Sequence, residues 1–181
     1  MGFDPNGHVR GTLRNLEESW QILVKEVGLC EPSESWTAAK RDGARYKTNV
    51  STYHTGYWAG AESGDFGRLN VTADGLRVDP PTWVIPHELG HVFQMHQEHA
   101  LKGEWWECHA NYLRERWLDA WHVVDPNPRG GSNLDPAFAE SAHFFTTWGG
   151  HYYLSWPIFL YLDENPDRLD GLGGNVSTRL W

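Results

Sequence analysis

Apolar residues recur at helical spacing along several stretches of the chain. Over residues 8–27 an apolar side chain returns every three or four positions, and Gly28 follows the last of them. This pattern predicts an amphipathic helix that a glycine ends. The same spacing predicts a helix over residues 104–121. A further helix is predicted over residues 152–162, with a kink or a start at Pro157.

Between the first two of these helices the pattern changes to that of strands and turns. Residues 46–53 predict a strand, and residues 68–78 predict a hairpin because two short strand-like segments flank an Asp-Gly turn signal. Residues 56–67, rich in Gly, Trp and Tyr, are expected to form a loop, as are residues 125–132. No internal repeat is present. The order of a helix, a small sheet and further helices predicts an α+β fold.

A short motif after the strand section carries the candidate chemistry. His87, Glu88 and His91 form the pattern HExxH, with apolar residues before it and after it. On a helix, positions i and i+4 lie on one face, so both imidazoles can point at a single metal ion while Glu88 handles a proton. The alternative is a helix that carries two histidines on its polar side.

A zinc site of this kind needs a third protein ligand and leaves the fourth position to water. The continuation HExxHxxGxxH is absent, since Gln94 stands where the glycine would be and Gln97 where the third histidine would be. Glu107 is the better candidate. If the first helix ends near residue 96 and the next begins near residue 102, a rise of about 1.5 Å per residue returns Glu107 to the level of His91. His109 is the second choice for the third ligand.

The two motif-bearing segments resemble the gluzincin branch of the zincin metallopeptidases, which carry HExxH on one helix and a glutamate ligand on the next. In many gluzincins a polar residue four positions after that glutamate hydrogen-bonds a zinc-binding histidine, and Asn111 holds that position here. More specifically, HELGHVFQ, WWECHANY and the later HYY and Trp156-Pro157 are similar to an uncharacterised zincin-like domain family of secreted microbial proteins. The resemblance covers roughly residues 10–181.

The resemblance implies one zincin-like catalytic domain over residues 1–181. The expected fold is a small mixed or antiparallel sheet packed on helices, with the HExxH helix central. In zincins the strand beside that helix receives an extended peptide by strand addition. A secreted, extracellular location is also expected from the resemblance alone.

The expected function is that of a zinc-dependent hydrolase, first of all a metallopeptidase acting on a peptide or glycopeptide. Zinc held by two neutral histidines and a carboxylate lowers the pKa of its water towards 7. Glu88 is expected to act as general base and then as general acid. The developing oxyanion needs a further donor, for which His151 and Tyr152 are favoured because each combines a donor with a position near two glycines. The alternative is that Tyr152 and Tyr153 only pack.

Composition narrows the list of partners. With 181 residues, of which 40% are hydrophobic, the chain can form one domain with a proper core. No apolar run approaches 18 residues, so no membrane span is expected. A net charge of −9 without a basic patch argues against nucleic acid. The N-terminus lacks the basic start and apolar run of a secretory signal, as a chain trimmed from a longer secreted protein would.

The cysteine content leaves two alternatives open. Cys30 and Cys108 could form a disulfide in an oxidising compartment, or both could be free buried thiols. Adjacent residues on a helix point about 100° apart, so Glu107 and Cys108 are not expected to face the same ion.

Eleven tryptophans raise a second function, that of a zinc-dependent glycan-acting enzyme or a carbohydrate-binding module. Some of them lie on apolar helical stripes and are expected in the core: Trp20, Trp117 and Trp121. Others lie in expected loops or at helix starts and remain available for a sugar: Trp36, Trp58, Trp83, Trp105 and Trp148. A third alternative is an inactive domain that keeps only the metal, against which the intact Glu88 argues.

Overall fold

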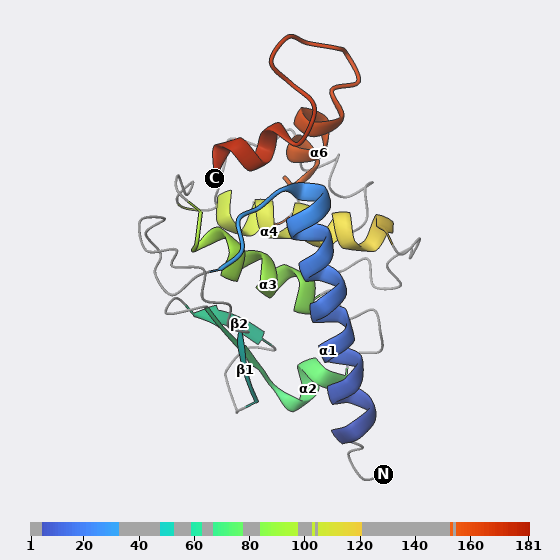
Figure 1. The fold of residues 1–181 in the computed structure, drawn as a ribbon, viewed down its shortest axis with the longest axis vertical. Coiled ribbons are helices and arrows are strands. Elements are labelled where there is room, and N and C mark those ends of the chain that lie inside the picture. Colours follow the sequence, from blue (N-terminus) through green and yellow to red (C-terminus); the bar gives the residue numbers. More distant parts are fainter. Residues whose placement is uncertain are drawn as a thin grey trace.

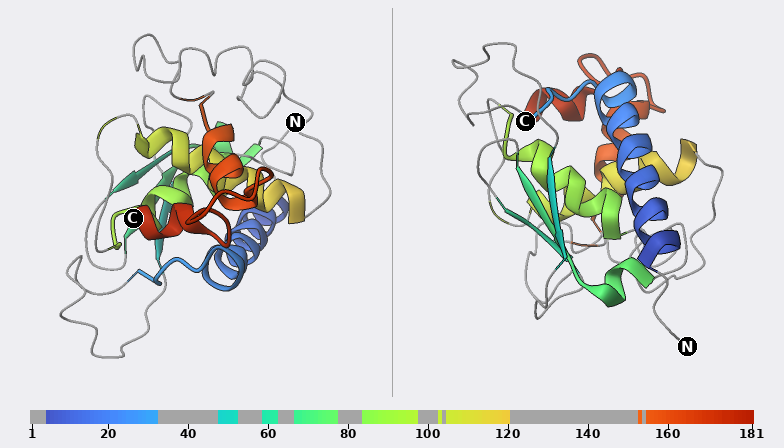
Figure 2. Two further views of the ribbon diagram at one scale, coloured as in Figure 1. Left: turned by 90° about the horizontal axis from the view of Figure 1, so that it is seen from above. Right: turned by 60° about the horizontal axis from the view of Figure 1, so that its bottom comes forward.

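The computed structural model of the chain describes residues 5–32, 48–52, 59–62, 67–77, 84–97, 103, 105–120, 153 and 155–181. Within these residues, helix α3 (Val84–Gln94) lies between a small sheet and helix α4 (Trp105–Ala120). A long N-terminal helix runs beside both of them (Figures 1 and 2). The α+β class is confirmed, and the helix that carries HExxH contacts the sheet and both neighbouring helices.

The N-terminal helix α1 (Pro5–Ile22) continues into a π-helical turn, η1 (Leu23–Val27). Gly28 ends this helical segment with φ of 84°, and its N–H donates to the Leu23 carbonyl. Glycine adopts this left-handed conformation without the steric cost that a Cβ brings. The helix predicted over residues 8–27 and its glycine end are therefore confirmed.

The sheet has three short strands, β1 (Asn49–Thr52), β2 (Ala59–Glu62) and β3 (Arg68–Val71), in the order β1-β3-β2. It is mixed, since β1 is parallel to β3 and β2 is antiparallel to it. β1 lies inside the predicted strand. The prediction of a loop over residues 56–67 is wrong for β2, whose sequence Ala-Gly-Ala-Glu has low strand propensity. Pairing with β3 and packing against α3 decide its structure instead.

The predicted hairpin over residues 68–78 is also wrong. The first half forms β3, but the Asp-Gly segment lies in a short helix, α2 (Ala73–Arg77). The Thr72 hydroxyl oxygen accepts a hydrogen bond from the Gly75 N–H at 3.1 Å, as a residue at a helix N-cap does. Leu76 is buried in a small core cluster with Val71. Capping by Thr72 and burial of Leu76 therefore outweigh the turn signal.

Helices α3 and α4 approach closely because Gly90 faces α4. A Cβ at this position would lie 3.1 Å from a methyl carbon of Leu113, so a larger residue would push the two helices apart. The main core forms where α3, α4 and the end of the N-terminal helix meet. Its members on α3 and α4 include Leu89, Val92, Phe93, Tyr112, Leu113 and Trp117.

The C-terminal part of the chain returns to the N-terminal helix. Helix α6 (Pro157–Glu164) begins at the predicted proline, and a 3₁₀ helix, η6 (Val176–Leu180), follows it. The Thr178 hydroxyl donates to the Val27 carbonyl at 2.7 Å, next to a hydrogen bond from the Asn175 side chain to the Glu26 carbonyl. The expected loop over residues 125–132 lies outside the described residues.

Two further expectations concern a membrane-spanning helix and the state of the two cysteines. Among the described residues, no helix combines the length and the apolar character that a membrane crossing requires. Cys30 is exposed, Cys108 is buried, and both are free. The disulfide alternative is therefore not found, and only one of the two thiols is buried.

Candidate metal centre

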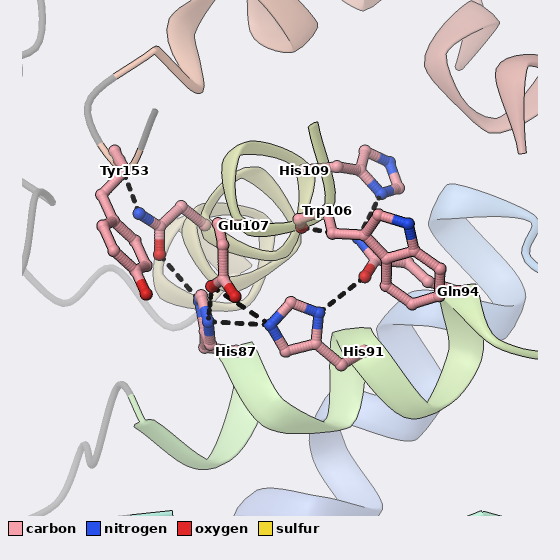
Figure 3. A network of polar contacts seen from close by, with 8 residues as sticks. His87, His91, Gln94, Trp106, Glu107, His109 and Tyr153 are labelled. Atoms are coloured by element: carbon pink, nitrogen blue, oxygen red, sulfur yellow. Dashed lines mark hydrogen bonds and ion pairs between the residues drawn. The ribbon is translucent and has the colours of Figure 1, made fainter. Parts of the chain in front are cut away.

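Three side chains from α3 and α4 converge on one point between the two helices (Figure 3). His87 Nε2 lies 3.1 Å from His91 Nε2 and 3.1 Å from Glu107 Oε2, and His91 Nε2 lies 3.3 Å from the same oxygen. The two histidines are one turn apart on α3, and Glu107 is in the first turn of α4. Because α3 ends at Gln94 and α4 begins at Trp105, the connection is short enough to return Glu107 to the level of His91. The structure thus brings together the three residues predicted as metal ligands.

Each histidine is held from behind by a side-chain amide. His87 Nδ1 lies 2.8 Å from Asn111 Oδ1, the hydrogen bond that the resemblance implied, and His91 Nδ1 lies 2.7 Å from Gln94 Oε1. Both amides are themselves oriented by backbone carbonyls. Asn111 Nδ2 donates to the Tyr153 carbonyl at 2.5 Å, and Gln94 Nε2 donates to the Trp106 carbonyl at 3.0 Å. A carbonyl oxygen only accepts, so the amide nitrogens must point at the carbonyls and the amide oxygens at the histidines.

This arrangement sets the tautomer of both rings. An amide oxygen accepts a hydrogen bond but cannot donate one, so Nδ1 of His87 and of His91 must carry a proton. In the neutral ring the lone pair is then on Nε2, the nitrogen that faces the convergence point. Proteins commonly fix metal-binding histidines in this way, because a hydrogen bond at one ring nitrogen orients the other towards the metal.

The distances within the cluster fit a zinc ion. Ligand bonds of about 2.0–2.1 Å in a tetrahedral arrangement place neighbouring ligand atoms about 3.3 Å apart. The three separations found are 3.1, 3.1 and 3.3 Å. A neutral His87 also brings its Nε2 lone pair against the Glu107 carboxylate, an unfavourable contact between two acceptors that a cation between them would relieve. The donor set of two imidazoles and one carboxylate therefore suits zinc.

The electrostatics of the cluster also favour a positive charge. Burial opposes ionisation of Glu107, but the contacts of its carboxylate with the ring nitrogens of His87 and His91 outweigh it and hold the pKa of this carboxyl well below its usual range. Burial also opposes a charge on His91, yet the hydrogen bond and the negative charge of Glu107 raise the pKa of its ring. Burial lowers the pKa of His87 to about 4, and the charge of His91 contributes. The lowered pKa of Glu107 and the raised pKa of His91 both favour a positive charge at the convergence point, which a bound metal cation would supply.

Glu88 follows the first histidine and belongs to a different environment. It is half-buried, and burial raises the pKa of its carboxyl to about 7, although the charge of His91 and a hydrogen bond from the Ala61 backbone oppose the shift. Ala61 is part of β2, so this carboxylate lies between the HExxH helix and the neighbouring strand. A carboxyl whose pKa is near 7 can both accept and donate a proton near neutral pH.

The remaining predicted site residues separate into two groups. His151 and Tyr152, the expected oxyanion donors, lie outside the described residues. His109, the second choice for the third ligand, is fully buried behind the cluster and contacts Gln94 instead, so it does not take part in the convergence. Cys108 is buried in the core, and burial raises the pKa of its thiol, which keeps it protonated and unsuited to bind a metal.

Two residues that contribute to the site are not among the predicted site residues. Gln94 lies three residues after His91, which places both on one face of α3. Tyr153 lies next to the predicted donor Tyr152 in the sequence. Its ring lies 6.3 Å from the ring of His87, and its carbonyl orients Asn111 (Figure 3). No local sequence pattern connects Tyr153 with α3, since only the tertiary structure brings them together.

Comparison with known proteins identifies the family but not an activity. Residues 5–181 match a protein family described as a family of unknown function, DUF6055, and the chain belongs to it. No curated protein matches the chain, and no solved structure does.

Proposed function

We propose that this protein is a zinc-dependent hydrolase, and specifically a metallopeptidase. The observation that carries the proposal is the convergence of His87, His91 and Glu107 at zinc-like separations, with an amide oxygen behind each histidine. A chance pair of histidines on the polar side of a helix would need neither the third ligand nor the two oriented amides. The described residues offer three protein ligands, the number that catalytic zinc sites have, with a water in the fourth position.

The residues around the cluster supply the other parts of a peptidase mechanism. When bound, zinc supplies Lewis acidity, which lowers the pKa of a water towards 7 and polarises a substrate carbonyl. Glu88 is not one of the three candidate metal ligands, and burial raises the pKa of its carboxyl to about 7. It would take a proton from the attacking water and deliver that proton to the leaving amine.

The exposed side of the cluster indicates where a substrate would enter. The Glu107 side chain is 30% exposed, whereas those of His87 and His91 are 7% and 10% exposed. Tyr153, which is 39% exposed, stands beside His87. Its phenol is the described group best placed to donate a hydrogen bond to a developing oxyanion.

The neighbouring strand supports a peptide substrate. β2 is an edge strand of the described sheet, it packs against α3, and the Ala61 N–H reaches Glu88. An extended peptide paired with this strand would run past the general base, and strand addition is a common way to hold a peptide. The glycan alternative gains no such support. Among the described tryptophans, Trp117, Trp156 and Trp181 are buried, and the rest are partly buried.

The proposal is tested by metal analysis of protein purified without added metal, followed by cleavage of a peptide library. We expect about one zinc per chain and turnover that Glu88→Gln lowers by at least about 10²–10⁴-fold while zinc is retained. Glu164→Gln changes an exposed glutamate on α6 in the same way and should leave turnover unchanged. Tyr153→Phe should keep zinc and lower kcat more than it raises KM.

Each other outcome has a distinct meaning. Full activity of Glu88→Gln on the best substrate would exclude the peptidase mechanism. Release of sugars without peptide cleavage would favour the glycan-acting enzyme. Stoichiometric zinc without any turnover would leave a domain that uses the metal for structure alone.

A further inference from the structure

A second layer of buried side chains lies behind the metal centre. Gln94, which orients His91 through its amide oxygen, uses its amide nitrogen for two acceptors (Figure 3). One is the Trp106 carbonyl at 3.0 Å, and the other is His109 Nδ1 at 3.0 Å. His109 must therefore present an unprotonated Nδ1 to Gln94. This fully buried ring is linked to the ligand His91 through one intermediate side chain.

Ring packing is what holds His109 in this orientation. Its Nε2 is buried and has no hydrogen-bond partner among the described residues. The ring is instead stacked on the indole of Trp181, with a centroid distance of 4.7 Å and an interplanar angle of 22°, and Phe159 meets it edge-on at 4.9 Å. Trp181 also contacts the indole of Trp106, with ring centroids 5.4 Å apart. The carbonyl of Trp106 is the one that orients Gln94. One aromatic side chain thus supports both acceptors that fix Gln94.

Trp181 is kept in place by a polar anchor in the C-terminal segment. The buried carboxylate of Asp163 on α6 accepts hydrogen bonds from the Ser177 N–H at 2.7 Å and the Ser177 hydroxyl at 2.5 Å. It also accepts one from the Tyr112 hydroxyl, and Tyr112 belongs to α4. This anchor fixes η6 against α4, the helix that supplies Glu107 and His109.

We propose that His109 and Trp181 are positioning residues for the metal centre, and that docking of η6 sets the metal affinity through Gln94 and His91. If Trp181 is absent, the His109 ring is free to turn and Gln94 loses an acceptor. The amide can then rotate and stop accepting from His91 Nδ1. A ligand whose outer hydrogen bond is lost binds its metal more weakly, commonly by about 10–100-fold. The inference rests on the proposed metal site.

Two pairs of variants test the proposal in the full chain, with zinc affinity measured by competition against a chelator. His109→Leu removes the acceptor for Gln94 and should weaken zinc binding about tenfold, whereas His109→Asn keeps an acceptor close to the Nδ1 position and should restore most of the affinity. Trp181→Leu should weaken binding, and Trp181→Phe should keep it. Phenylalanine preserves the stacked ring, and the indole nitrogen of Trp181 has no hydrogen-bond partner among the described residues to lose.

A control and a spectroscopic measurement separate positioning from general destabilisation. Leu76→Ala shortens a buried side chain that α2 contributes to the small core cluster, away from Gln94 and His109, so it should lower Tm without changing zinc affinity. In Co²⁺-substituted protein, His109→Leu should shift the visible absorption bands, while Leu76→Ala should not.

If His109→Leu and Trp181→Leu are folded and bind zinc as the unmodified chain does, with unchanged Co²⁺ spectra, the positioning role is refuted although the metal site stands. If the unmodified chain binds no zinc, both the proposed function and this inference fall.

Discussion

Replacing Glu88 by glutamine should stabilise the metal-free protein above pH 7 and leave its stability unchanged near pH 4. The carboxyl has a pKa of about 7 in the folded protein against 4.5 as the reference value, because burial disfavours its charge. At pH values between these two pKa values, the carboxyl is mostly protonated in the folded state and mostly ionised in the unfolded state. The stability of the unmodified chain therefore falls as the pH rises through this window. Glutamine has the size of the protonated acid and does not titrate, so it avoids this loss.

The size of this stability difference follows from the raised pKa of Glu88. The pKa in the folded protein lies about 2.5 above the reference value, and at about 1.4 kcal/mol per pKa unit this corresponds to about 3 kcal/mol in the free energy of unfolding. Glu88 is half-buried, so residual contact with water reduces the effect, and we expect about 2 kcal/mol.

The assay is urea unfolding of both proteins at pH 4, 6 and 8 with a chelator present. The advantage of Glu88→Gln should be absent at pH 4 and complete at pH 8. Glu107→Gln serves as the contrasting variant. The pKa of Glu107 is lowered, so the stability that it contributes is present above about pH 4.5 and is lost only as the pH falls well below that value; Glu107→Gln should therefore destabilise the protein at pH 6 and pH 8 alike. If Glu88→Gln is equally stable or less stable at pH 8, the carboxyl is not buried in the way that the structure describes, and its role as a base with a pKa near neutrality loses its support.

Three further predictions concern the metal and the packing. Asn111→Ala should weaken zinc binding by about 10–100-fold, because His87 loses the acceptor that orients it; a chelator-competition titration measures this. Chelation should lower Tm without unfolding the chain, since the core does not depend on the metal; a random-coil circular dichroism spectrum after chelation would contradict this. Gly67→Ala should cost about 2–4 kcal/mol in urea unfolding, because a Cβ would lie 2.3 Å from a methyl carbon of Val92 at a φ of 67°. Gly60→Ala, where nothing lies within 4 Å, should cost much less and is the matched control.

The sequence by itself determined the helices and the candidate ligands. Apolar spacing is a local property, so it predicted the N-terminal helix, the glycine at its end and the helix of residues 105–120. The HExxH spacing placed two histidines on one face of a helix. The number of residues between the motif and Glu107 sufficed to bring that carboxylate back to the same level, because α3 ends soon after the second histidine.

Only the tertiary structure decided the strand section and the surroundings of the ligands. β2 has almost no strand signal of its own and exists because β3 and α3 offer it partners. The Asp-Gly segment forms a helix because Thr72 caps it and Leu76 has a core to enter. The hydrogen bonds and packing around the candidate metal ligands likewise depend on contacts between distant segments. Tyr153 orients Asn111 and Trp181 stacks on His109 across separations that no local pattern records. A local pattern can place a ligand on a helix, but the groups that fix its orientation come from wherever the fold brings the chain back.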